Sequence, residues 1–303
     1  MGTYVTISLE KEKIEHSKAV FERLKKVEMA LSSYDPQAEI YRLNHEHETQ
    51  ISSDTYEALQ LSAHYYKQTN GYFDITIGSI TKGLFNFGEE ERIPTQKELL
   101  EAKVDFKGLH FTKTKAWTDE GVKIDFGGMG KGFGVDKAVE HLKEQGVSWG
   151  VVALSGDIFC LHACEMRIQD PFSDGILARF TMAQKNTAIS TSGNYRRYVQ
   201  SSDYNHLINP KTRASQKTFA SISLISDRYS NSDLDAYATA ASVMPKHEAF
   251  AFLNAFSRLG YLVVNNDKKM VMNEDFKTLT RWLEIKKIER SSSAKPLIYL
   301  PWI

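Results

Sequence analysis

The glycine-rich stretch from Asp125 to Leu142 carries the strongest chemical signal in the sequence. It reads DFGGMGKGFGVDKAVEHL, with five glycines in the eight positions 127–134 and Lys131 among them, and it runs into a helical pattern. Glycines let backbone N–H and C=O groups approach a ligand, and a helix that begins beside a lysine favours a phosphate. A tight turn packed against a neighbouring helix is the alternative, and the stretch alone does not decide between them.

Neither familiar phosphate-binding loop fits this stretch. A dinucleotide-binding fingerprint needs glycine at i, i+2 and i+5, and no start at Gly127, Gly128 or Gly130 satisfies it. A Walker A loop needs Gly-Lys followed by Ser or Thr, whereas Lys131 is followed by Gly132. The two common nucleotide-binding motifs are therefore excluded, while the physical reason to expect a phosphate remains.

A second group of reactive side chains lies in SDLDAYATAA, residues 232–241. Asp233 can cap a helix, and Asp235 and Thr239 then share one helical face, one turn apart. A carboxylate and a hydroxyl so placed suit Mg2+, which prefers hard oxygen ligands and completes its shell with water and phosphates. The alternative is structural: an acid that stabilises the helix dipole and a threonine that packs among alanines. As a metal ligand, Asp235 is expected to face solvent, so that its loss leaves the fold largely intact.

His206 is a third candidate, in NHLINPKT at 205–212. A histidine can take a proton from a hydroxyl near neutral pH, but it can equally be a buried imidazole whose hydrogen bonds are satisfied. The HEH at 45–47 lacks the spacing of a helical metal pair and is interpreted as a solvated turn.

Composition limits the class of protein that must position these groups. Of 303 residues 42% are apolar and 25% charged, and 38 basic residues balance 38 acidic ones. The chain can therefore bury a substantial core, and no basic tract predicts a nucleic-acid partner. No apolar run approaches the roughly 20 residues that span a bilayer. The opening MGTYVTISL is typical of a strand rather than a signal peptide.

Cys160 and Cys164 are too few for a disulfide scaffold or a zinc site, and we expect buried free thiols.

The elements of the first half follow from periodicity and end signals. Apolar spacing predicts helices, and alternation predicts strands. We expect strands at 3–9, 121–125 and 149–155, and helices at 13–31, 54–69, 95–103 and 131–145. The helix at 95–103 begins with Thr95, and Glu98 follows three residues on, which is the pattern of a capping box.

The second half of the chain has a different predicted content of strands and helices. Residues 165–225 are mostly β by composition, and a helical pair and a hairpin follow. We expect strands at 166–169, 176–183, 195–200, 219–226, 259–266 and 268–273, and helices at 232–244 and 247–259. The closing PLIYLPWI, 296–303, fits either a packed strand or a sticky edge. Because no linker or repeat divides the chain, we predict a single intertwined α+β unit over 1–303.

The motifs, taken together and in order, resemble those of the ApbE family of flavin transferases. The matches, over roughly residues 1–244, are MGT at 1–3, SY at 33–34, IYRLN at 40–44, GYFDIT at 71–76, Asp125 with GKG at 130–132 and VD at 135–136, SGDI at 155–158, STSGNY at 190–195, HLINP at 206–210, and DAYATA at 235–240. The resemblance implies an ApbE-like, T-fold-like architecture with mixed or antiparallel sheets flanked by helices.

The resemblance also implies an activity and its requirements. The expected reaction is Mg2+-dependent transfer of the FMN half of FAD to a threonine of an acceptor protein, within a Ser/Thr-rich motif, with release of AMP. The expected metal ligands are the side chains of Asp235 and Thr239 and a backbone oxygen of Gly128. Lys131 is expected to stabilise the phosphates and His206 to act as base. The positions that the resemblance assigns to the flavin and adenosine pockets are Met1, Tyr34, Tyr72, Phe73, Asp74, Asp125, Lys131 and Leu207.

Three departures from the family pattern leave alternatives open. Asn209 stands where the family has a carboxylate, Arg213 where it has a glycine, and Ser155 where it has the first glycine of Gly-Gly-Asp. The alternatives are a Mg2+-dependent FAD pyrophosphatase, with water as the attacking group, and an FAD-binding protein without turnover. The resemblance implies the periplasmic side of a bacterial inner membrane, as a lipoprotein whose leader lies upstream of this numbering. The alternative is a cytoplasmic location.

Overall fold

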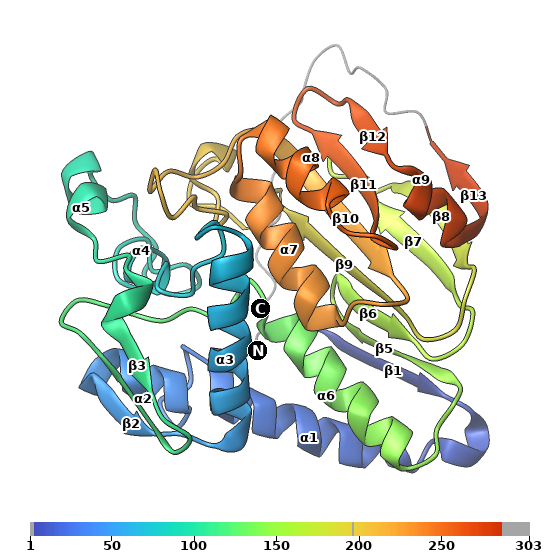
Figure 1. Cartoon of the computed structure of the whole chain (residues 1–303), viewed down its shortest axis with the longest axis horizontal. Coiled ribbons are helices and arrows are strands. Elements are labelled where there is room, and N and C mark those ends of the chain that lie inside the picture. The colour runs from blue at the N-terminus through green and yellow to red at the C-terminus, as the bar shows by residue number, and fades with distance from the viewer. Residues whose placement is uncertain (1–2, 196, 287–303) are drawn as a thin grey trace.

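A seven-stranded antiparallel sheet forms the centre of the computed structural model, which describes residues 3–195 and 197–286 (Figure 1). The strand order is β1-β5-β6-β9-β10-β11-β12. The strands are β1 Val5–Leu9, β5 Gly150–Leu154, β6 Asp157–Cys160, β9 Thr187–Gly193, β10 Phe219–Ser226, β11 Gly260–Asn265 and β12 Met270–Met272. The predicted α+β class with antiparallel sheets is confirmed, and PLIYLPWI lies outside the described residues.

Two three-stranded sheets accompany the central one. One has the order β13-β8-β7 and the other β2-β4-β3. The first packs on the central sheet through a shared apolar cluster that includes Phe180, Ile189 and Leu262. The six strands are β7 Glu165–Gln169, β8 Ile176–Met182, β13 Thr280–Ile285, β2 Glu48–Gln50, β3 Leu109–Phe111 and β4 Lys115–Thr118.

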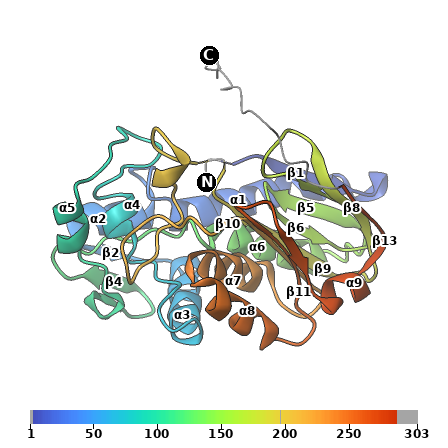
Figure 2. The ribbon, with the colours of Figure 1, turned by 90° about the horizontal axis from the view of Figure 1, so that it is seen from above.

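Helices α6 and α7 cover the other face of the central sheet (Figures 1 and 2). The α-helices are α1 His16–Leu31, α2 Glu39–Glu46, α3 Ser53–Gln68, α4 Gly78–Thr81, α5 Gln96–Glu101, α6 Gly130–Glu144, α7 Asn231–Val243, α8 Lys246–Asn254 and α9 Glu274–Thr278. Short 3-10 turns are η1 Lys11–Lys13, η2 Phe106–Gly108 and η3 Ser202–Tyr204. The capping box predicted from Thr95 and Glu98 is present at the start of α5.

The N-terminal ends of α6 and α7 meet closely, and glycine permits this. A β-carbon on Gly132 would lie 2.2 Å from the carbonyl oxygen of Asn231. Asp136 in the next turn of α6 accepts hydrogen bonds from the backbone N–H groups of Asn231, at 2.9 Å, and Ser232, at 2.8 Å. The side-chain amide of Asn231 donates to the carbonyls of Ile158 in β6 and Ile189 in β9. The start of α7 is therefore tied to α6 and to two strands.

The predicted strand at 121–125 is wrong. Among the described residues, the β pairing of this segment is limited to one isolated bridge, between Ile77 and Lys123. Val122 and Ile124 are buried, which explains the alternating pattern. The backbone of Ile124 is paired instead with the side-chain amide of Asn44, which donates to its carbonyl at 2.8 Å and accepts from its N–H at 2.6 Å. An amide side chain thus takes the place of a neighbouring strand.

The predicted strand at 195–200 is also wrong for its described residues; Arg196 lies outside them. Here the chain bends, and one bridge, between Tyr198 and Asn205, closes a loop around η3. The regular strand in this region is β9, which ends at Gly193. The tyrosines and the valine of YRRYVQ gave a composition typical of a strand. The loop is held instead by Asn205, whose amide donates to the carbonyls of Ser202 and Gln216.

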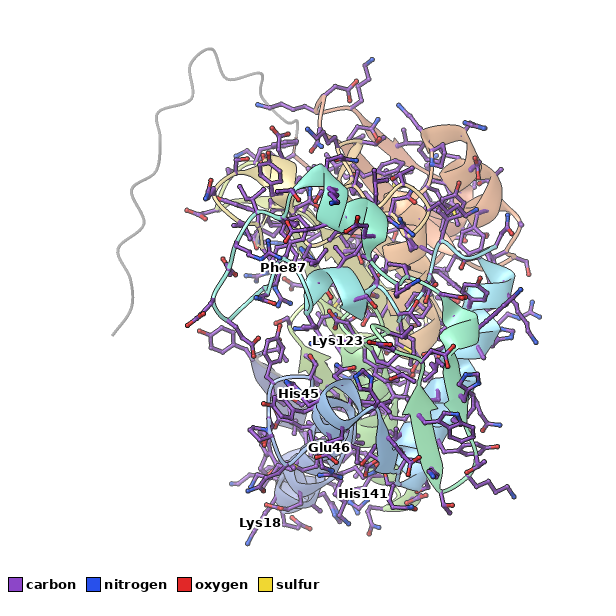
Figure 3. All side chains as sticks on the ribbon, turned by 90° about the vertical axis from the view of Figure 1, so that its left-hand side faces the viewer. Lys18, His45, Glu46, Phe87, Lys123 and His141 are labelled. Carbon is purple, nitrogen blue, oxygen red and sulfur yellow. A yellow bond between two sulfur atoms is a disulfide. The ribbon has the colours of Figure 1, made fainter. Side chains whose placement is uncertain are left out.

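Two smaller expectations are corrected. Cys160 and Cys164 form a disulfide with 6.0 Å between their Cα atoms, so the free-thiol interpretation is wrong. The loop after β6 brings the two side chains together, a contact that four-residue spacing alone did not indicate. The HEH segment is the end of a helix rather than a turn, because His45 and Glu46 close α2 (Figure 3) and His47 follows in the left-handed conformation.

Candidate active site

One cavity of about 680 Å³ gathers the predicted site residues. Its volume lies within the range of about 300–1,000 Å³ that is usual for ligand pockets. The predicted residues that line it are Tyr34, Tyr72, Phe73, Asp74, Asp125, Gly128, Lys131, His206, Leu207, Asp235 and Thr239. Met1 lies outside the described residues. Residues separated by two hundred positions in the chain therefore face one space.

Lys131 lies between two buried carboxylates at the start of α6. Its Nζ is 2.7 Å from Oδ2 of Asp157, an ion pair rather than an aligned hydrogen bond. It also donates to Oδ2 and Oδ1 of Asp235, at 3.1 and 3.3 Å. Burial alone would lower the pKa of Lys131, but the two carboxylates raise it above its ordinary value. The lysine is therefore a fixed cation in the cavity.

Asp235 is almost fully buried, with 2% of its surface exposed. The expectation that it faces solvent is wrong, because α7 presents it to the first turn of α6. Its Oδ2 also accepts a hydrogen bond of 3.1 Å from the backbone N–H of Gly132. The carboxylate is thus held by a helix N-terminus and an ammonium group, which are the two kinds of partner that stabilise a buried anion.

Asp157 is the second acid at this point, and it is completely buried. Burial and the neighbouring charge of Asp235 raise its pKa above the ordinary value, against the opposing effect of Lys131. Its Oδ1 accepts a hydrogen bond from the hydroxyl of Ser190 in β9. It begins β6, so the central sheet supplies this second partner of Lys131.

The residues around Asp235 suit a magnesium ion. Thr239, one turn further along α7, has its hydroxyl 3.4 Å from that of Ser192. A β-carbon on Gly128 would lie 2.9 Å from Cγ2 and 3.3 Å from Oγ1 of Thr239, so the glycine turn passes directly beside this hydroxyl. Across residues 3–195 and 197–286 no three His, Cys, Asp or Glu side chains form a metal cluster. The available donor set is therefore one carboxylate, hydroxyls and backbone oxygens, which fits Mg2+ better than zinc.

The imidazole of His206 is held in one orientation. Its Nδ1 lies 3.1 Å from the carbonyl oxygen of Arg197, and its backbone N–H donates to the same oxygen. A carbonyl only accepts, so Nδ1 carries the proton and the lone pair of the neutral ring is on Nε2. Burial lowers the pKa of His206 to about 4, an effect that the hydrogen bond to Arg197 partly offsets. The ring is therefore neutral at physiological pH and can accept a proton.

An aromatic and cationic group lies at another wall of the cavity. The hydroxyl of Tyr34 donates to the carbonyl of Phe87 at 2.9 Å, and Nζ of Lys82 lies 3.4 Å from the centre of the Tyr34 ring. The guanidinium of Arg197 donates to the same carbonyl at 3.0 Å and contacts the Tyr34 hydroxyl. Phe87 lies on the side of the molecule seen in Figure 3. Of this group Tyr34, Phe87 and Arg197 line the cavity, so the wall offers aromatic side chains and a positive charge.

Asp74 and Asp125 both line the cavity, but their pKa values are shifted in opposite directions. Asp74 accepts from the N–H and hydroxyl of Thr76, at 2.8 and 2.6 Å, yet burial raises its pKa to about 6. Asp125 accepts from the hydroxyl of Thr81 and the N–H of Gly127, at 2.6 and 2.8 Å. Burial would raise the pKa of Asp125 as well, but Lys82, Thr81 and Arg197 hold it below its ordinary value. Asp125 is therefore the stronger anion of the two.

Two residues of the site, Asp157 and Arg197, were not identified as site residues from the sequence. Asp157 was noted only as part of the SGDI motif, although an acid after two small residues at a strand start was a usable signal. No sequence pattern pointed to Arg197, because it holds His206 through its backbone carbonyl, which every residue has. Both act across long stretches of chain, and local spacing does not report such contacts.

The three departures from the family pattern are accommodated. The side-chain amide of Asn209 donates to the carbonyl of Val243 at 2.7 Å, a bond that an ionised carboxylate cannot make, and its Oδ1 accepts from the N–H of Lys211. Arg213 takes the left-handed conformation, with φ of 61°, that the family's glycine would favour. Ser155 does likewise, with φ of 53°, and its side chain is exposed.

The fold and the cavity first define the class of protein. This is an α+β protein in which Lys131, Asp235 and His206 line one large cavity at the N-terminus of a helix, with the buried Asp157 paired to the lysine. The sequence profile of the ApbE family matches residues 1–263. The chain belongs to the ApbE family.

Curated relatives extend the comparison. The FAD:protein FMN transferase of Treponema pallidum is 27% identical over 282 residues, covering 83% of this chain and 77% of the relative. The FAD:protein FMN transferase of Vibrio cholerae is 26% identical over 263 residues, covering 80% and 78%. Both relatives are named as enzymes of one activity.

Solved structures show the same fold. The crystal structure of the ApbE protein of Thermotoga maritima superposes with a TM-score of 0.82 at 24% identity, covering 92% of this chain and 96% of that one. The flavin transferase ApbE of Vibrio cholerae gives a TM-score of 0.77 at 23% identity, with the same coverage.

Proposed function

We propose that this protein transfers the FMN half of FAD to a threonine hydroxyl of an acceptor protein, with Mg2+, and releases AMP. The observation that carries the proposal is the meeting of Lys131, Asp235, Thr239 and His206 in one cavity of an ApbE-family chain. The curated relatives described above are named FAD:protein FMN transferase, which supports the same reaction here.

FAD would bind along the part of the cavity that Tyr34, Phe73, Asp125 and the turn before α6 line. Aromatic faces of Tyr34 and Phe73 suit the flat ring systems of the ligand, and the turn before α6 suits its diphosphate. The ionised carboxylate of Asp125 would accept a hydrogen bond from a hydroxyl or ring N–H, since it is kept anionic by Lys82. The wall around Tyr72 and Leu207 would exclude water from the reacting phosphate.

Asp235, Thr239 and the backbone of Gly128 would hold the Mg2+ ion. When bound, the ion withdraws charge from the phosphate oxygens and so favours the transition state over the bound substrate. Lys131 would remain beside Asp157 and face the same oxygens, because its second carboxylate partner holds it in the cavity. Both cations would offset negative charge on the diphosphate.

The reaction forms one bond and breaks another. The threonine oxygen bonds to the phosphorus of the FMN half, the bond from that phosphorus to the bridging oxygen breaks, and that oxygen leaves with AMP. The hydroxyl proton passes to Nε2 of His206, which is unprotonated because Nδ1 donates to the carbonyl of Arg197. The neutral imidazole therefore supplies the base that a weak nucleophile needs.

We further propose that the protein works as one unit outside the cytoplasm of a bacterium, at its inner membrane. Support for one unit is that β1, near the start of the chain, pairs with β5 in the central sheet. Support for the location is the disulfide between Cys160 and Cys164, since disulfides persist in oxidising compartments. Among the described residues, none of the helices has the length and apolar character needed to cross a membrane.

A gel assay tests the reaction. The protein is incubated with FAD, Mg2+ and a candidate acceptor carrying one Thr in a Ser/Thr-rich motif, and a denaturing gel is viewed under ultraviolet light. We expect a fluorescent acceptor band that is lost when the acceptor Thr is changed to Val or Mg2+ is chelated. Free FMN and AMP without the band would indicate a pyrophosphatase, and intact bound FAD would indicate a carrier; either result contradicts the proposal.

A further inference from the structure

Ser192 in β9 lines the cavity, and the reaction proposed above assigns it no role. The residue is buried, with 9% of its surface exposed, and α7 packs on its strand (Figure 1). Its hydroxyl lies 3.4 Å from the hydroxyl of Thr239 in α7. The turn at Gly128 passes beside the same threonine, because a β-carbon on Gly128 would lie 3.3 Å from Oγ1 of Thr239. Ser192 therefore lies beside the proposed metal and diphosphate sites.

The two hydroxyls share one hydrogen bond but carry two protons. Each hydroxyl has one O–H to donate and two lone pairs that accept. Across residues 3–195 and 197–286, the contact between Ser192 and Thr239 is the one hydrogen bond that either hydroxyl makes. Elsewhere in α7, by contrast, the hydroxyl of Ser242 donates to the carbonyl of Ala238 four residues earlier, at 2.7 Å, as hydroxyls in helices often do. One O–H of the pair is therefore left for a ligand in the cavity.

The proposed metal contact decides which of the two hydroxyls keeps the free proton. If Thr239 binds Mg2+ through its oxygen, a lone pair of that oxygen faces the ion and the O–H must point away from it. Ser192 is the acceptor within reach of this O–H. The proton of Ser192 is then the one that remains, and it can donate to an anionic oxygen of a ligand. Such charge-assisted hydrogen bonds are roughly twice as strong as neutral ones.

We propose that Ser192 is a substrate-binding residue, which accepts the O–H of Thr239 and donates its own O–H to an oxygen of the FAD diphosphate. This inference rests on the FAD and Mg2+ sites of the proposed function, and it assigns a phosphate contact to a strand of the central sheet. The direction in which this hydroxyl donates depends on the ion at Thr239. We therefore expect Ser192 to contribute more to FAD binding when Mg2+ is present.

A second hydroxyl pair of β9 provides the matched control. Thr191 points to the opposite face of β9 from Ser192, because successive residues of a strand alternate. Its hydroxyl lies 2.9 Å from that of Ser223, the residue opposite it in β10, which is completely buried. Ser223→Ala thus breaks a hydroxyl pair, as Ser192→Ala does, but it leaves the neighbour of Thr239 in place.

FAD titrations with and without Mg2+ test the assignment. The full chain is titrated with FAD in the absence of acceptor, in buffer that contains Mg2+ or EDTA, and binding is followed by flavin fluorescence. In Mg2+ we expect Ser192→Ala to raise the FAD dissociation constant about tenfold or more, as for loss of a hydrogen bond to a charged group. In EDTA we expect an increase at least about threefold smaller. Ser223→Ala should match the wild type in both buffers.

Ser192→Cys separates hydrogen bonding from packing. The thiol fills the space of the hydroxyl but is a weak donor, so in Mg2+ we expect this variant to bind FAD as weakly as Ser192→Ala does. Wild-type affinity in either Ser192 variant, an equal loss with and without Mg2+, or the same loss in Ser223→Ala overturns the assignment. A wild type that shows the Mg2+-dependent pattern but flavinylates no acceptor would instead reject the proposed transfer reaction and support the contact of Ser192.

Discussion

Nζ of Lys131 lies 3.1 Å from Oδ2 of Asp235, so the carboxylate proposed to hold a metal already has a cation beside it. Asp157 is the second partner of the same ammonium group, at 2.7 Å. A divalent ion that binds Asp235 must therefore displace Lys131 from it, and Asp157 keeps the lysine in the cavity. The ion pair and the metal compete for one carboxylate, and this competition can be measured.

Lys131→Met should make Mg2+ bind more tightly and the metal-free protein less stable. The change removes the competing ammonium group but leaves two buried carboxylates, and breaking a buried ion pair costs about 3–5 kcal/mol. We expect the Mg2+ dissociation constant from titration calorimetry to fall on the order of tenfold, which is about 1.4 kcal/mol. Lys137→Met is the control, because Lys137 pairs with Glu57 and Glu140. Weaker Mg2+ binding in Lys131→Met would contradict the competition.

Asp235→Asn should remove Mg2+-dependent turnover while the protein stays folded. Asparagine keeps the shape of the side chain but not the charge that attracts the ion, and Lys131 retains Asp157 as its partner. We expect turnover to fall by about 100-fold or more, as for loss of a group that stabilises transition-state charge. The measurement is AMP release against Mg2+ concentration, with circular dichroism to check folding. Wild-type turnover in the variant would reject the metal assignment.

The contribution of His206 to the transfer rate should stay nearly constant between about pH 6 and 8. The base must be unprotonated, and the pKa of His206 is lowered to about 4, so the rate rises with pH through about 4 and is then level. An unperturbed histidine would instead give a midpoint near about 6.5. The measurement is kcat/KM against pH for the wild type, with His206→Ala expected to be slow at every pH. A midpoint near 6.5 that vanishes in His206→Ala would disprove the lowered pKa.

Gly132→Ala should destabilise the protein and separate the two helices that carry the site. Its β-carbon would lie 2.2 Å from the carbonyl of Asn231, a backbone atom that cannot move without shifting α7. Gly130→Ala is the matched control, because its β-carbon would meet only Phe126, at 3.5 Å. We expect thermal denaturation to show a lower Tm for Gly132→Ala and an unchanged or higher Tm for Gly130→Ala, since alanine favours helix by about 1 kcal/mol. Equal Tm values would show that the close contact is unimportant.

Asn209→Asp, which restores the family residue, should lower stability in this chain. The amide donates to the carbonyl of Val243, and an ionised carboxylate would leave that carbonyl without its partner. We expect a loss of about 1–3 kcal/mol in the free energy of unfolding, measured by urea denaturation at neutral pH. Asn266→Asp is the control, because Asn266 makes a similar bond to the carbonyl of Lys217 but is exposed. A gain in stability at position 209 would show that the asparagine is not adapted to this site.

The sequence predicted those elements whose signals are local. The helix after the glycines, the helix that carries Asp235, and the capped helix at Thr95 all formed where apolar spacing and end signals placed them. Their apolar faces and caps are properties of neighbouring residues. Burial of Asp235 was missed because it depends on how closely α6 approaches, which Gly132 decides.

Contacts between distant segments account for the other errors. Ile124 is buried between partly exposed neighbours, as a strand residue would be, but Asn44, eighty positions earlier, takes its backbone hydrogen bonds. The orientation of His206 depends on the carbonyl of Arg197, which no side-chain pattern reports. Of the site, the sequence predicted which residues would meet but not the ion pairs that hold them together.

The most direct test of the central claim is a crystal structure of the protein with FAD and Mn2+ in place of Mg2+, located by its anomalous signal. The account predicts a metal peak within coordination distance of Asp235 and Thr239, with the FAD diphosphate against the turn at Gly128 and Lys131 moved toward Asp157. A peak elsewhere, or FAD bound outside this cavity, would contradict it.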